Sequence, residues 1–448
     1  MKSMLQLCRE DKDTVQVVTF ASQARQLWPK PVPVNAENIG RAEGKRIVAV
    51  VGAGPAGLAA AVEAKRLGLK DLVVFDRDEK PGGILRQCIH AGFGLEKFQE
   101  ELTGPEYAHR YLKLAQAEGV DFALDTTVLE MDRDRVLTVV SARDGLRQVE
   151  CGSIILAMGC RERPRGAIGI PGTRPAGIFT AGHAQRLINI EGYMPGRTVV
   201  VLGSGDIGLI MARRLTLEGA QVMAVAEILP YPSGLVRNVV QCLHDFDIPL
   251  LLSHTVAEVH GDRRVEGVTL VRVDDRWTPV PGTERRIGCD TLLLSVGLIP
   301  ENELSKGAGV AMDQRTAGAV INDFFETTVP GVFSCGNVLH VNDVVDNVSS
   351  EGENAAHGAY LRLKGRMPDR TSMVPIEPDE PATATRTGGM ASALRSGRRS
   401  RARARASGVT LVSPRSRRGA RDRRPGAPRR PRGRCGSPRA PQPRRTRR

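Results

Sequence analysis

The chain has 448 residues, and its 64 Lys and Arg against 50 Asp and Glu give a formal net charge of +14. Its apolar fraction of 41% excludes fibrous and fully disordered proteins, and its length allows two or three domains. The charge is uneven, because residues 381–448 hold 22 Arg, no Lys and one acid, a local net charge of +21. Residues 1–380 carry 42 bases and 49 acids, a net charge of −7. The body therefore indicates an ordinary, mildly acidic soluble protein, and the basic character belongs to a tail.

Eight cysteines are scattered along the chain, and none forms a C-x-x-C pair. This spacing does not support a zinc ribbon, a dithiol redox pair or an iron–sulfur cluster, and no metal site is expected. The start of the chain has no secretory signal, and the longest uncharged stretch, residues 47–62, is too short for a membrane span. We therefore expect a cytoplasmic protein with reduced thiols and no membrane span.

Residues 1–44 mix charges and prolines without a sustained period and are interpreted as an N-terminal extension. The pattern then becomes strand, glycine turn, helix and strand. Residues 47–51 read as a continuous apolar strand of the kind found in parallel sheets. A helix is expected from residue 55 to 67, and a second strand over residues 72–75.

Thr103 followed by Glu106 predicts a capping box and a helix that ends near residue 118. The first pattern then repeats about 150 residues later in the chain, with a strand at 198–202, a helix at 207–218 and a strand at 221–226. One motif used twice predicts an α/β fold with two Rossmann-like dinucleotide-binding domains.

The first glycine turn is Gly52-Ala53-Gly54-Pro55-Ala56-Gly57. Its glycines allow a tight turn, close approach of the backbone to a pyrophosphate, and close packing of helix on sheet. The helix that follows presents free N–H groups to the phosphates. Asp76, which follows Gly52 by 24 residues, ends the second strand, where its carboxylate can accept both hydroxyls of an adenosine ribose.

The second glycine turn is Gly203-Ser204-Gly205-Asp206-Ile207-Gly208, and Glu227 again follows its first glycine by 24 residues. Asp206 is a candidate cap for its helix. Because an acid at position 227 repels a 2′-phosphate, this site is expected to prefer NAD(H) over NADP(H). Two dinucleotide sites in one chain indicate electron transfer between two cofactors.

Further segments carry a family resemblance. Together with the two turns, they resemble the two-dinucleotide-binding-domain flavoproteins of the pyridine nucleotide–disulfide oxidoreductase superfamily over residues 46–365. Two departures are Met158 in place of the family's Thr and Asn337 in place of its Asp. The segments are Asp76-Arg77 with Gly82-Gly83, then Ile154 to Gly159, Ser295 to Asn302, and Val332 to Asn337.

The resemblance implies FAD and NAD(H) as cofactors, with the NAD domain inserted in a discontinuous FAD domain. The implied division is an N-terminal extension (1–44), the first FAD-binding segment (45–160), an NAD(H)-binding domain (161–290), the returning FAD-binding segment (291–368) and a disordered Arg-rich tail (369–448). The expected cofactor-binding residues are Gly52, Gly54, Pro55, Ala56, Gly57, Asp76, Arg77, Gly82, Gly83, Val128, Ala157, Gly159, Gly203, Gly205, Asp206, Ile207, Gly208, Glu227, Gly297, Gly336 and Asn337.

Disulfide reductases of this superfamily carry a cysteine pair, whereas this chain has a single thiol, Cys88, soon after the double glycine. Thioredoxin, glutathione or lipoamide reductase activity is therefore not expected. Cys88 and His90 are the candidate catalytic residues, as a flavin-adjacent thiolate and its base, in the manner of single-cysteine NADH oxidases and peroxidases. The other interpretation, which we favour, is a packed Cys and a hydrogen-bonded His that line the flavin pocket.

Residues 87–94, 100–107 and 338–349 resemble a narrower bacterial group, encoded beside glycerol-3-phosphate-dehydrogenase-like flavoproteins and a small cysteine-rich companion. They also resemble the alpha subunits of opine, sarcosine and hydroxyproline dehydrogenases. This resemblance implies a subunit of a heteromeric dehydrogenase. A partner flavoprotein would oxidise the substrate, this chain would exchange hydride between its FAD and NAD(H), and a small cysteine-rich protein would carry electrons. The sequence leaves undecided whether the chain forms a homo-oligomer. The alternative function is that of a self-sufficient NADH oxidase or peroxidase that uses Cys88.

Residues 381–448 consist mainly of Arg, Ala, Pro, Gly and Ser, so they cannot bury a core and are expected to be disordered. A third alternative is a nucleic-acid-binding flavoprotein that uses its 22 tail arginines. The tail lacks the aromatic residues that single-strand binders use for stacking, so a nucleic-acid partner is not favoured. The composition also matches G+C-rich DNA translated out of frame from about residue 381, and this hypothesis is preferred.

Overall fold

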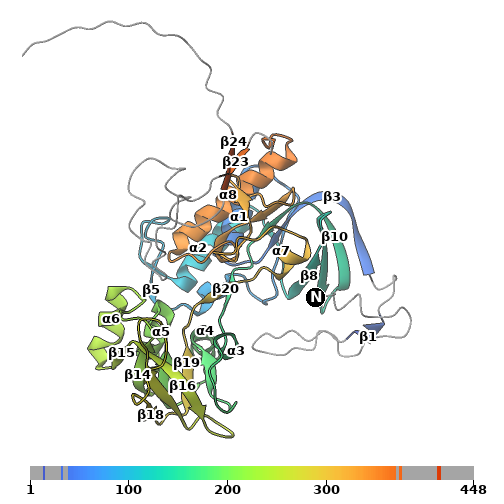
Figure 1. The fold of residues 1–448 in the computed structure, drawn as a ribbon. Coiled ribbons are helices and arrows are strands. Elements are labelled where there is room, and N and C mark those ends of the chain that lie inside the picture. Colours follow the sequence, from blue (N-terminus) through green and yellow to red (C-terminus); the bar gives the residue numbers. More distant parts are fainter. Residues whose placement is uncertain (1–13, 16–31, 34–38, 370–372, 376–410, 415–448) are drawn as a thin grey trace, which may run out of the picture. The chain divides into compact units, whose positions relative to one another are not determined.

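The computed structural model describes residues 14–15, 32–33, 39–369, 373–375 and 411–414, and side chains within 47–369 (Figure 1). Two separate sheets with parallel strands carry the two glycine turns. This mixed α/β architecture confirms the predicted fold class.

The larger sheet is built around two long strands, β3 (Ile39–Val51) and β10 (Gly145–Leu156), which pair in parallel. The strand order is β7-β4-β3-β10-β9-β8, and β22 also pairs with β10. Pairing is parallel from β7 to β10 and antiparallel from β10 to β8. The other strands are β4 (Leu72–Phe75), β7 (Asp121–Ala123), β8 (Thr126–Met131), β9 (Val136–Ser141) and β22 (Val332–Ser334).

β3 is longer than the sequence predicts. Its first half, residues 39–46, falls almost entirely in the expected N-terminal extension, but it pairs with β10 in a register that places Ile39 opposite Leu146. This half contains four charged residues and two glycines. A continuous apolar run indicates a strand that is buried on both faces, and only the second half of β3 has such a run. The charged first half therefore gives no strand signal in the sequence.

The apolar run of β3 is buried on both faces. Val48 and Val50 belong to one core cluster, and Ala49 and Val51 belong to another. Because successive residues of a strand point to opposite faces, a strand covered on both sides must be apolar at every position. Residues 47–51 therefore form a central strand, as their sequence predicts.

Three helices cover one face of the larger sheet: α1 (Pro55–Arg66), α2 (Gly104–Ala117) and α8 (Val345–Leu363) (Figure 1). α1 and α8 pack closely, because a Cβ at Gly352 of α8 would overlap the carbonyl oxygen of Ala56. Glycine at this position permits the contact.

The start of α2 confirms the predicted capping box. The Thr103 hydroxyl accepts a hydrogen bond from the Glu106 N–H, and the Glu106 carboxylate accepts one from the Thr103 N–H at 2.8 Å. This reciprocal pair satisfies two backbone donors that the helix leaves open.

The smaller sheet is fully parallel, with strand order β12-β19-β13-β14-β15. Its last strand in sequence, β19, pairs with β13 and β12. Its strands are β12 (Ile178–Thr180), β13 (Thr198–Leu202), β14 (Gln221–Glu227), β15 (Leu250–Leu252) and β19 (Thr291–Leu294).

The helices that accompany the smaller sheet are α4 (Ala181–Arg186), the π-helix η4 (Leu187–Glu191), α5 (Asp206–Leu217), α6 (Val236–Cys242) and η5 (His244–Phe246). An antiparallel sheet lies beside them in sequence, formed by β16 (His254–His260), β17 (Gly267–Arg272) and β18 (Arg285–Ile287). The chain crosses between the two large sheets at β11 (Cys160–Glu162) and β20 (Leu298–Pro300), which pair antiparallel.

The remaining elements are short. They are β1 (Thr14–Val15), β2 (Val32–Pro33), η3 (Gly83–Gln87), β5 (Ala91–Phe93), β6 (Leu102–Thr103), α3 (Arg165–Ile168), α7 (Glu303–Gly307), β21 (Ile321–Asn322), η6 (Gly336–Val338), β23 (Met373–Pro375) and β24 (Leu411–Pro414). β24 belongs to the Arg-rich tail and pairs with β21 and β23. The rest of residues 381–448 lies outside the described residues, so disorder of the tail stays a prediction.

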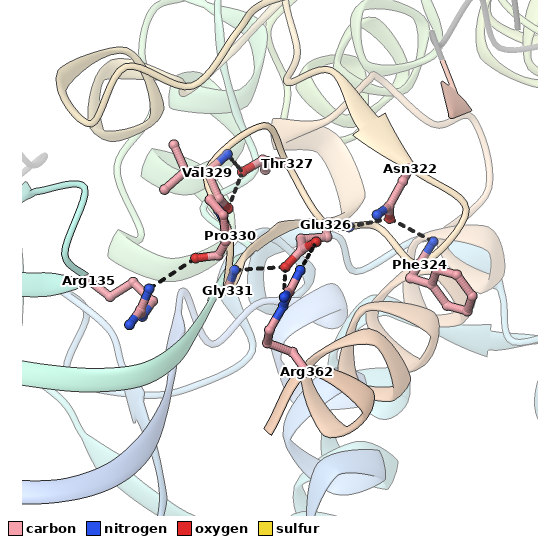
Figure 2. A network of polar contacts seen from close by, with 9 residues as sticks. All are labelled: Arg135, Asn322, Phe324, Glu326, Thr327, Val329, Pro330, Gly331 and Arg362. Atoms are coloured by element: carbon pink, nitrogen blue, oxygen red, sulfur yellow. Dashed lines mark hydrogen bonds and ion pairs between the residues drawn. The ribbon is translucent and has the colours of Figure 1, made fainter. Parts of the chain in front are cut away.

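A buried ion pair attaches α8 to the segment before β22 (Figure 2). The side chain of Glu326 has no exposed surface, and both its oxygens accept hydrogen bonds from Arg362, at 2.7 and 2.6 Å. The same carboxylate accepts the Gly331 N–H at 2.8 Å. Removing the bidentate partner of a buried carboxylate is costly.

We expect Arg362→Met to lower the free energy of unfolding by about 3 kcal/mol, because it leaves the Glu326 carboxylate buried without its guanidinium. The matched control is Arg66→Met, since Arg66 pairs with Glu118 at an exposed surface. Exposed pairs contribute at most about 1 kcal/mol. Urea unfolding measures both variants. Equal losses in the free energy of unfolding would show that the buried Arg362–Glu326 pair stabilises the fold no more than an exposed pair does.

Candidate functional site

The first glycine turn is fixed to the next strand by a short set of hydrogen bonds. The Ala53 N–H donates to Asp76 Oδ2 at 2.6 Å, and the Asp78 N–H donates to Asp76 Oδ1 at 2.8 Å. Further along, the Gly82 N–H donates to the Ala53 carbonyl at 2.8 Å. The acid, the turn and the double glycine thus form one hydrogen-bonded frame.

The second glycine turn has the same frame. The Ser204 N–H donates to Glu227 Oε2 at 2.9 Å, and the Leu229 N–H donates to Glu227 Oε1 at 3.1 Å. The Gly234 N–H donates to the Ser204 carbonyl at 2.9 Å, as Gly82 does at the first turn. The repeat seen in the sequence therefore extends to individual hydrogen bonds.

The first glycine of each turn has a backbone conformation that disfavours other residues. Gly52 has φ of +104° and Gly203 has φ of +99°. A Cβ on Gly52 would lie 2.5 Å from the carbonyl oxygen of Ala157, and a Cβ on Gly203 would overlap the Ser295 carbonyl. The chain just after β10, at Ala157, therefore lies against the first glycine turn, and the chain just after β19, at Ser295, lies against the second.

Both turns lead into a helix whose N-cap is a glycine without a capping side chain, Gly54 for α1 and Gly205 for α5, although in α5 the Gly208 N–H donates to Ser295 Oγ at 3.1 Å. Such N-termini offer backbone N–H groups to an anion. The expectation that Asp206 caps α5 is wrong, because Asp206 is the first residue of the helix and not its N-cap. Its Oδ1 instead accepts bonds from the Leu235 N–H and Asn238 Nδ2, which join α5 to the start of α6.

The Asp76 carboxylate is half-buried and accepts hydrogen bonds from two backbone N–H groups. Burial raises the pKa of Asp76, while the N–H groups of Asp78 and Ala53 act against this rise. A carboxylate offers about four acceptor positions, so positions remain for the hydroxyls of a ribose. These residues fit the adenosine end of a dinucleotide such as FAD.

Several of the expected cofactor-binding segments come together around this turn. A Cβ on Gly83 would lie 2.9 Å from the Gly54 Cα, and a Cβ on Gly336 would lie 2.8 Å from the Ala56 Cβ. Both glycines therefore lie against the first turn and its helix. The sequence places these segments in one site only by family resemblance, and the fold supplies their proximity.

Gly336 has a partner that sequence reasoning missed. Its N–H donates to Glu351 Oε2 of α8 at 2.8 Å, and His340 Nε2 lies 3.4 Å from the other Glu351 oxygen. Burial lowers the pKa of His340. Beside them, Asn337 Oδ1 accepts the Asn342 N–H at 3.0 Å, so the amide that replaces the family's Asp holds its own loop.

The other expected residues lie at the edge of this group. Arg77 is exposed and Val128, in β8, is half-buried. The Gly159 carbonyl accepts the Glu301 N–H, and the Gly297 carbonyl accepts the Arg163 N–H. The two glycines thus fix the chain where β11 and β20 cross between the two sheets, and their contact with a cofactor stays a prediction.

Cys88 is buried, with 5% of its surface exposed. Its Sγ donates to the Ile84 carbonyl at 3.3 Å and lies 3.7 Å from Gln185 Oε1. Burial raises the pKa of the Cys88 thiol to about 12. At neutral pH the group is a protonated thiol, whereas nucleophilic chemistry requires a thiolate.

The ring of His90 is directed to its own loop. Its Nδ1 lies 3.1 Å from the Ala91 carbonyl, and its ring centre lies 5.1 Å from that of Phe93. Burial lowers the pKa of His90. Within the described residues, the geometry does not provide the thiolate–base pair that a single-cysteine peroxidase needs, and it favours the packed Cys and His.

Three amide side chains around Cys88 have no signal in the sequence. Gln87 Nε2 donates to the Gly182 carbonyl and to Gln185 Oε1, at 2.8 and 3.0 Å. Asn189 Nδ2 donates to the Gln87 carbonyl at 2.8 Å. Gln185 is 1% exposed, and its Nε2 has no hydrogen-bond partner among the described residues. An unpaired buried amide is costly, and the described residues supply no partner that would offset this cost at Gln185.

A family model described as pyridine nucleotide-disulphide oxidoreductase matches residues 46–359. The chain belongs to the pyridine nucleotide-disulphide oxidoreductase family. It is therefore an oxidoreductase of a flavoprotein family that binds FAD and uses NAD(P). The match begins at the strand before the first glycine turn and ends within α8, so it includes both hydrogen-bonded frames.

Relatives of this family member are named as components of larger enzymes. An opine oxidase subunit of Agrobacterium tumefaciens is 29% identical over 310 residues, which cover 64% of this chain and 60% of that protein. Hydrogen cyanide synthase subunit HcnB of Pseudomonas aeruginosa is 27% identical over 352 residues, covering 73% and 72%. The chain thus matches less than two thirds of the length of the opine oxidase protein.

Among solved structures, thioredoxin reductase of T. acidophilum is 25% identical with a TM-score of 0.57, covering 70% of this chain and 98% of that one.

The six cysteines of this family member that lie among its described residues are all free thiols. Across the same residues there is no group of His, Cys, Asp or Glu that could hold a metal ion. No described helix is long and apolar enough to cross a membrane.

We expect Cys88 to resist iodoacetamide at pH 8 in the folded protein. With a pKa of about 12, about one thiol in 10,000 is a thiolate at that pH, against about a quarter in the unfolded chain. Mass spectrometry of the peptide that contains Cys88, before and after urea unfolding, measures this difference. Rapid labelling of the folded protein would contradict the packed-thiol interpretation and revive the peroxidase alternative.

The same burial predicts a loss of stability at alkaline pH. Burial raises the pKa of Cys88 and Cys151 to about 12 and of Cys289 to about 11. Because the folded pKa values lie above the unfolded value near 8.5, these thiols stabilise the fold below about pH 8.5 and lose this contribution as the pH rises. Urea midpoints measured from pH 7 to 10 should fall above that value, and Cys151→Ala should reduce the slope.

Proposed function

We propose that this chain is an FAD-dependent electron-transfer subunit that passes hydride or electrons between NAD(H) and a partner flavoprotein. The observation that carries this proposal is the duplicated frame, in which Asp76 and Glu227 hold two glycine turns through equivalent hydrogen bonds. FAD, when bound, supplies a carrier that takes a hydride from reduced nicotinamide and passes electrons onward.

The first frame fits FAD better than the second, because Asp76 retains acceptor positions for a ribose. The residues that would hold FAD are Gly52, Gly54 and Gly57 at the pyrophosphate, Asp76 at the ribose, and Gly336 with Asn337 beside α1. The Gly54 end of α1 would stabilise the negative charge of the phosphates. The second frame, at Gly203–Gly208, would hold NAD(H).

An acceptor outside the chain is supported by the state of the thiols. The described residues hold no cysteine pair that forms a disulfide, and the Cys88 thiol is protonated at neutral pH. Relatives that carry the word subunit in their names are consistent with a partner protein. We propose that the partner is a flavoprotein dehydrogenase, with a small cysteine-rich electron carrier as a further component. Free thiols fit a reducing compartment, and we propose the cytoplasm as the location.

We expect Asp76→Ala to purify with little FAD, because hydrogen bonds to a charged group contribute about 1.5–3 kcal/mol, equivalent to roughly a tenfold to hundredfold change in affinity. The measurement is the flavin-to-protein absorbance ratio, followed by FAD titration of the stripped protein. The control is Asp71→Ala, which removes an exposed carboxylate just before the other end of β4. Equal FAD content in both variants would refute the role of Asp76.

We expect anaerobic NADH to reduce the flavin of the wild-type protein and of Cys88→Ser at the same rate. Reoxidation by peroxide should be slow in both, because no thiolate lies ready to react. Stopped-flow absorbance measures both steps. Fast peroxide turnover that Cys88→Ser abolishes would replace this proposal with the NADH peroxidase. Co-purification of the native protein identifies the partner.

A further inference from the structure

Helix α8 and the loop before it carry two histidine–glutamate pairs that differ in burial. His340 Nε2 lies 3.4 Å from Glu351 Oε1, and these two side chains are 19% and 11% exposed. His357 Nε2 lies 2.9 Å from Oε1 of Glu63 in α1, but the His357 side chain is 53% exposed. The chain therefore offers one enclosed pair and one exposed pair of the same chemistry.

The enclosed pair lies against the first turn of α1. Glu351 Oε2 accepts the Gly336 N–H at 2.8 Å, and a Cβ on Gly336 would lie 2.8 Å from the Ala56 Cβ. On the next residue of α8, Gly352, a Cβ would overlap the Ala56 carbonyl oxygen. Because Ala56 is the second residue of α1, the Glu351 carboxylate is held beside the N-terminal turn that fits the pyrophosphate of FAD.

The imidazole of His340 has one nitrogen that is free to take up a proton. Its Nδ1 is buried and has no hydrogen-bond partner among the described residues. Its Nε2 faces the Glu351 carboxylate, which favours the hydrogen on that nitrogen, so Nδ1 carries the lone pair of the neutral ring. Burial lowers the pKa of His340 from its ordinary value of about 6.5, so the ring is neutral at pH 7.

Glu351 is the charged side chain within ion-pair distance of His340 in the part of the chain that the structure describes. Asn342, whose Nδ2 donates to the His340 carbonyl, is neutral, and the Cys335 thiol before η6 is protonated because burial raises its pKa. α1 has no charged residue before Glu63, which lies about two turns beyond Ala56. The other charged residues on the elements packed around η6 are Asp343 in the same loop, Asp346 in α8, Asp313 and Arg315 in the loop that contacts Leu339, and Glu301 and Glu303, which pair with Arg161.

FAD would add negative charge beside this pair, because its pyrophosphate is an anion. An added negative charge raises the pKa of a neighbouring imidazole, and burial limits the screening of that charge by salt. Desolvation by the cofactor acts in the other direction, but it has little left to remove, since only 19% of the His340 side chain is exposed. The charge therefore decides the sign, and the pKa of His340 rises when FAD binds.

We propose that FAD binding is coupled to the uptake of a proton at His340 Nδ1, an inference that rests on the proposed function. Protonation turns the contact between His340 and Glu351 into an ion pair, so that the Glu351 charge no longer opposes the pyrophosphate. The affinity for FAD is therefore greatest below the pKa of His340 in the free protein. It falls as the pH rises through that pKa and the higher pKa of the complex, and it is constant above both.

The test is titration calorimetry of FAD into the stripped protein at pH 6.5, in cacodylate and in imidazole buffer. These buffers differ in ionisation enthalpy, so the difference in heat gives the number of protons taken up with each FAD. We expect proton uptake by the wild type and by His357→Gln, the matched exposed histidine, and none by His340→Gln. The FAD affinity of the wild type should also fall about tenfold between pH 5.5 and 8, as for a pKa that rises by about one on binding, and that of His340→Gln should stay constant.

Circular dichroism of each stripped variant checks the fold. If His340→Gln does not fold, Glu351→Gln keeps an acceptor for the Gly336 N–H, removes the charge and should lower proton uptake. FAD binding without proton uptake by the wild type, or with uptake that His340→Gln retains, would overturn the proposal and leave the proposed function intact. Proton-coupled FAD binding without flavin reduction by NADH would refute the proposed function and leave the role of His340 intact. A wild type that binds no FAD would refute both.

Discussion

One hydrogen bond, used twice, organises this molecule: the N–H of the second residue of a glycine turn donates to the acid at the end of the next strand. At the first turn it joins Ala53 to Asp76, and at the second it joins Ser204 to Glu227. The bond fixes the turn relative to the sheet, so the helix behind it begins at a defined point. The N-termini of α1 and α5, which fit the phosphates of a dinucleotide, depend on that position.

The two copies have diverged in chemistry while keeping this frame. At the second turn the acid also accepts the hydroxyls of Ser204 and Ser233, which have no counterpart at the first turn. The backbone bonds are unaffected by such changes, since they use groups that nearly every residue has. The same backbone hydrogen bonds can therefore hold different side chains beside the acid. Those side chains set how many of the acid's acceptor positions stay free for a ligand.

Much of this arrangement could be predicted from the sequence, because it is local. The spacing between Gly52 and Asp76 follows from the length of one helix and one strand, and the capping box at Thr103 lies within one helical turn. Contacts between distant segments could not be predicted. The sequence separation of Glu326 and Arg362 gives no sign that they form an ion pair. Gln185 bonds Gln87 only because the fold brings α4 beside it. The charged first half of β3 has no apolar signal at all.

The position of β22 in the larger sheet bears on how the chain folds as it is synthesised. β22 pairs with β10, and α8 packs on α1, although both are made after the whole of the smaller sheet. The smaller sheet takes its strands from the continuous segment between β12 and β19, and all of them are present once residue 294 has left the ribosome. Domains generally fold as units in the order of synthesis. The smaller sheet is therefore completed first, while the larger sheet, already covered in part by α1 and α2, still lacks β22 and α8.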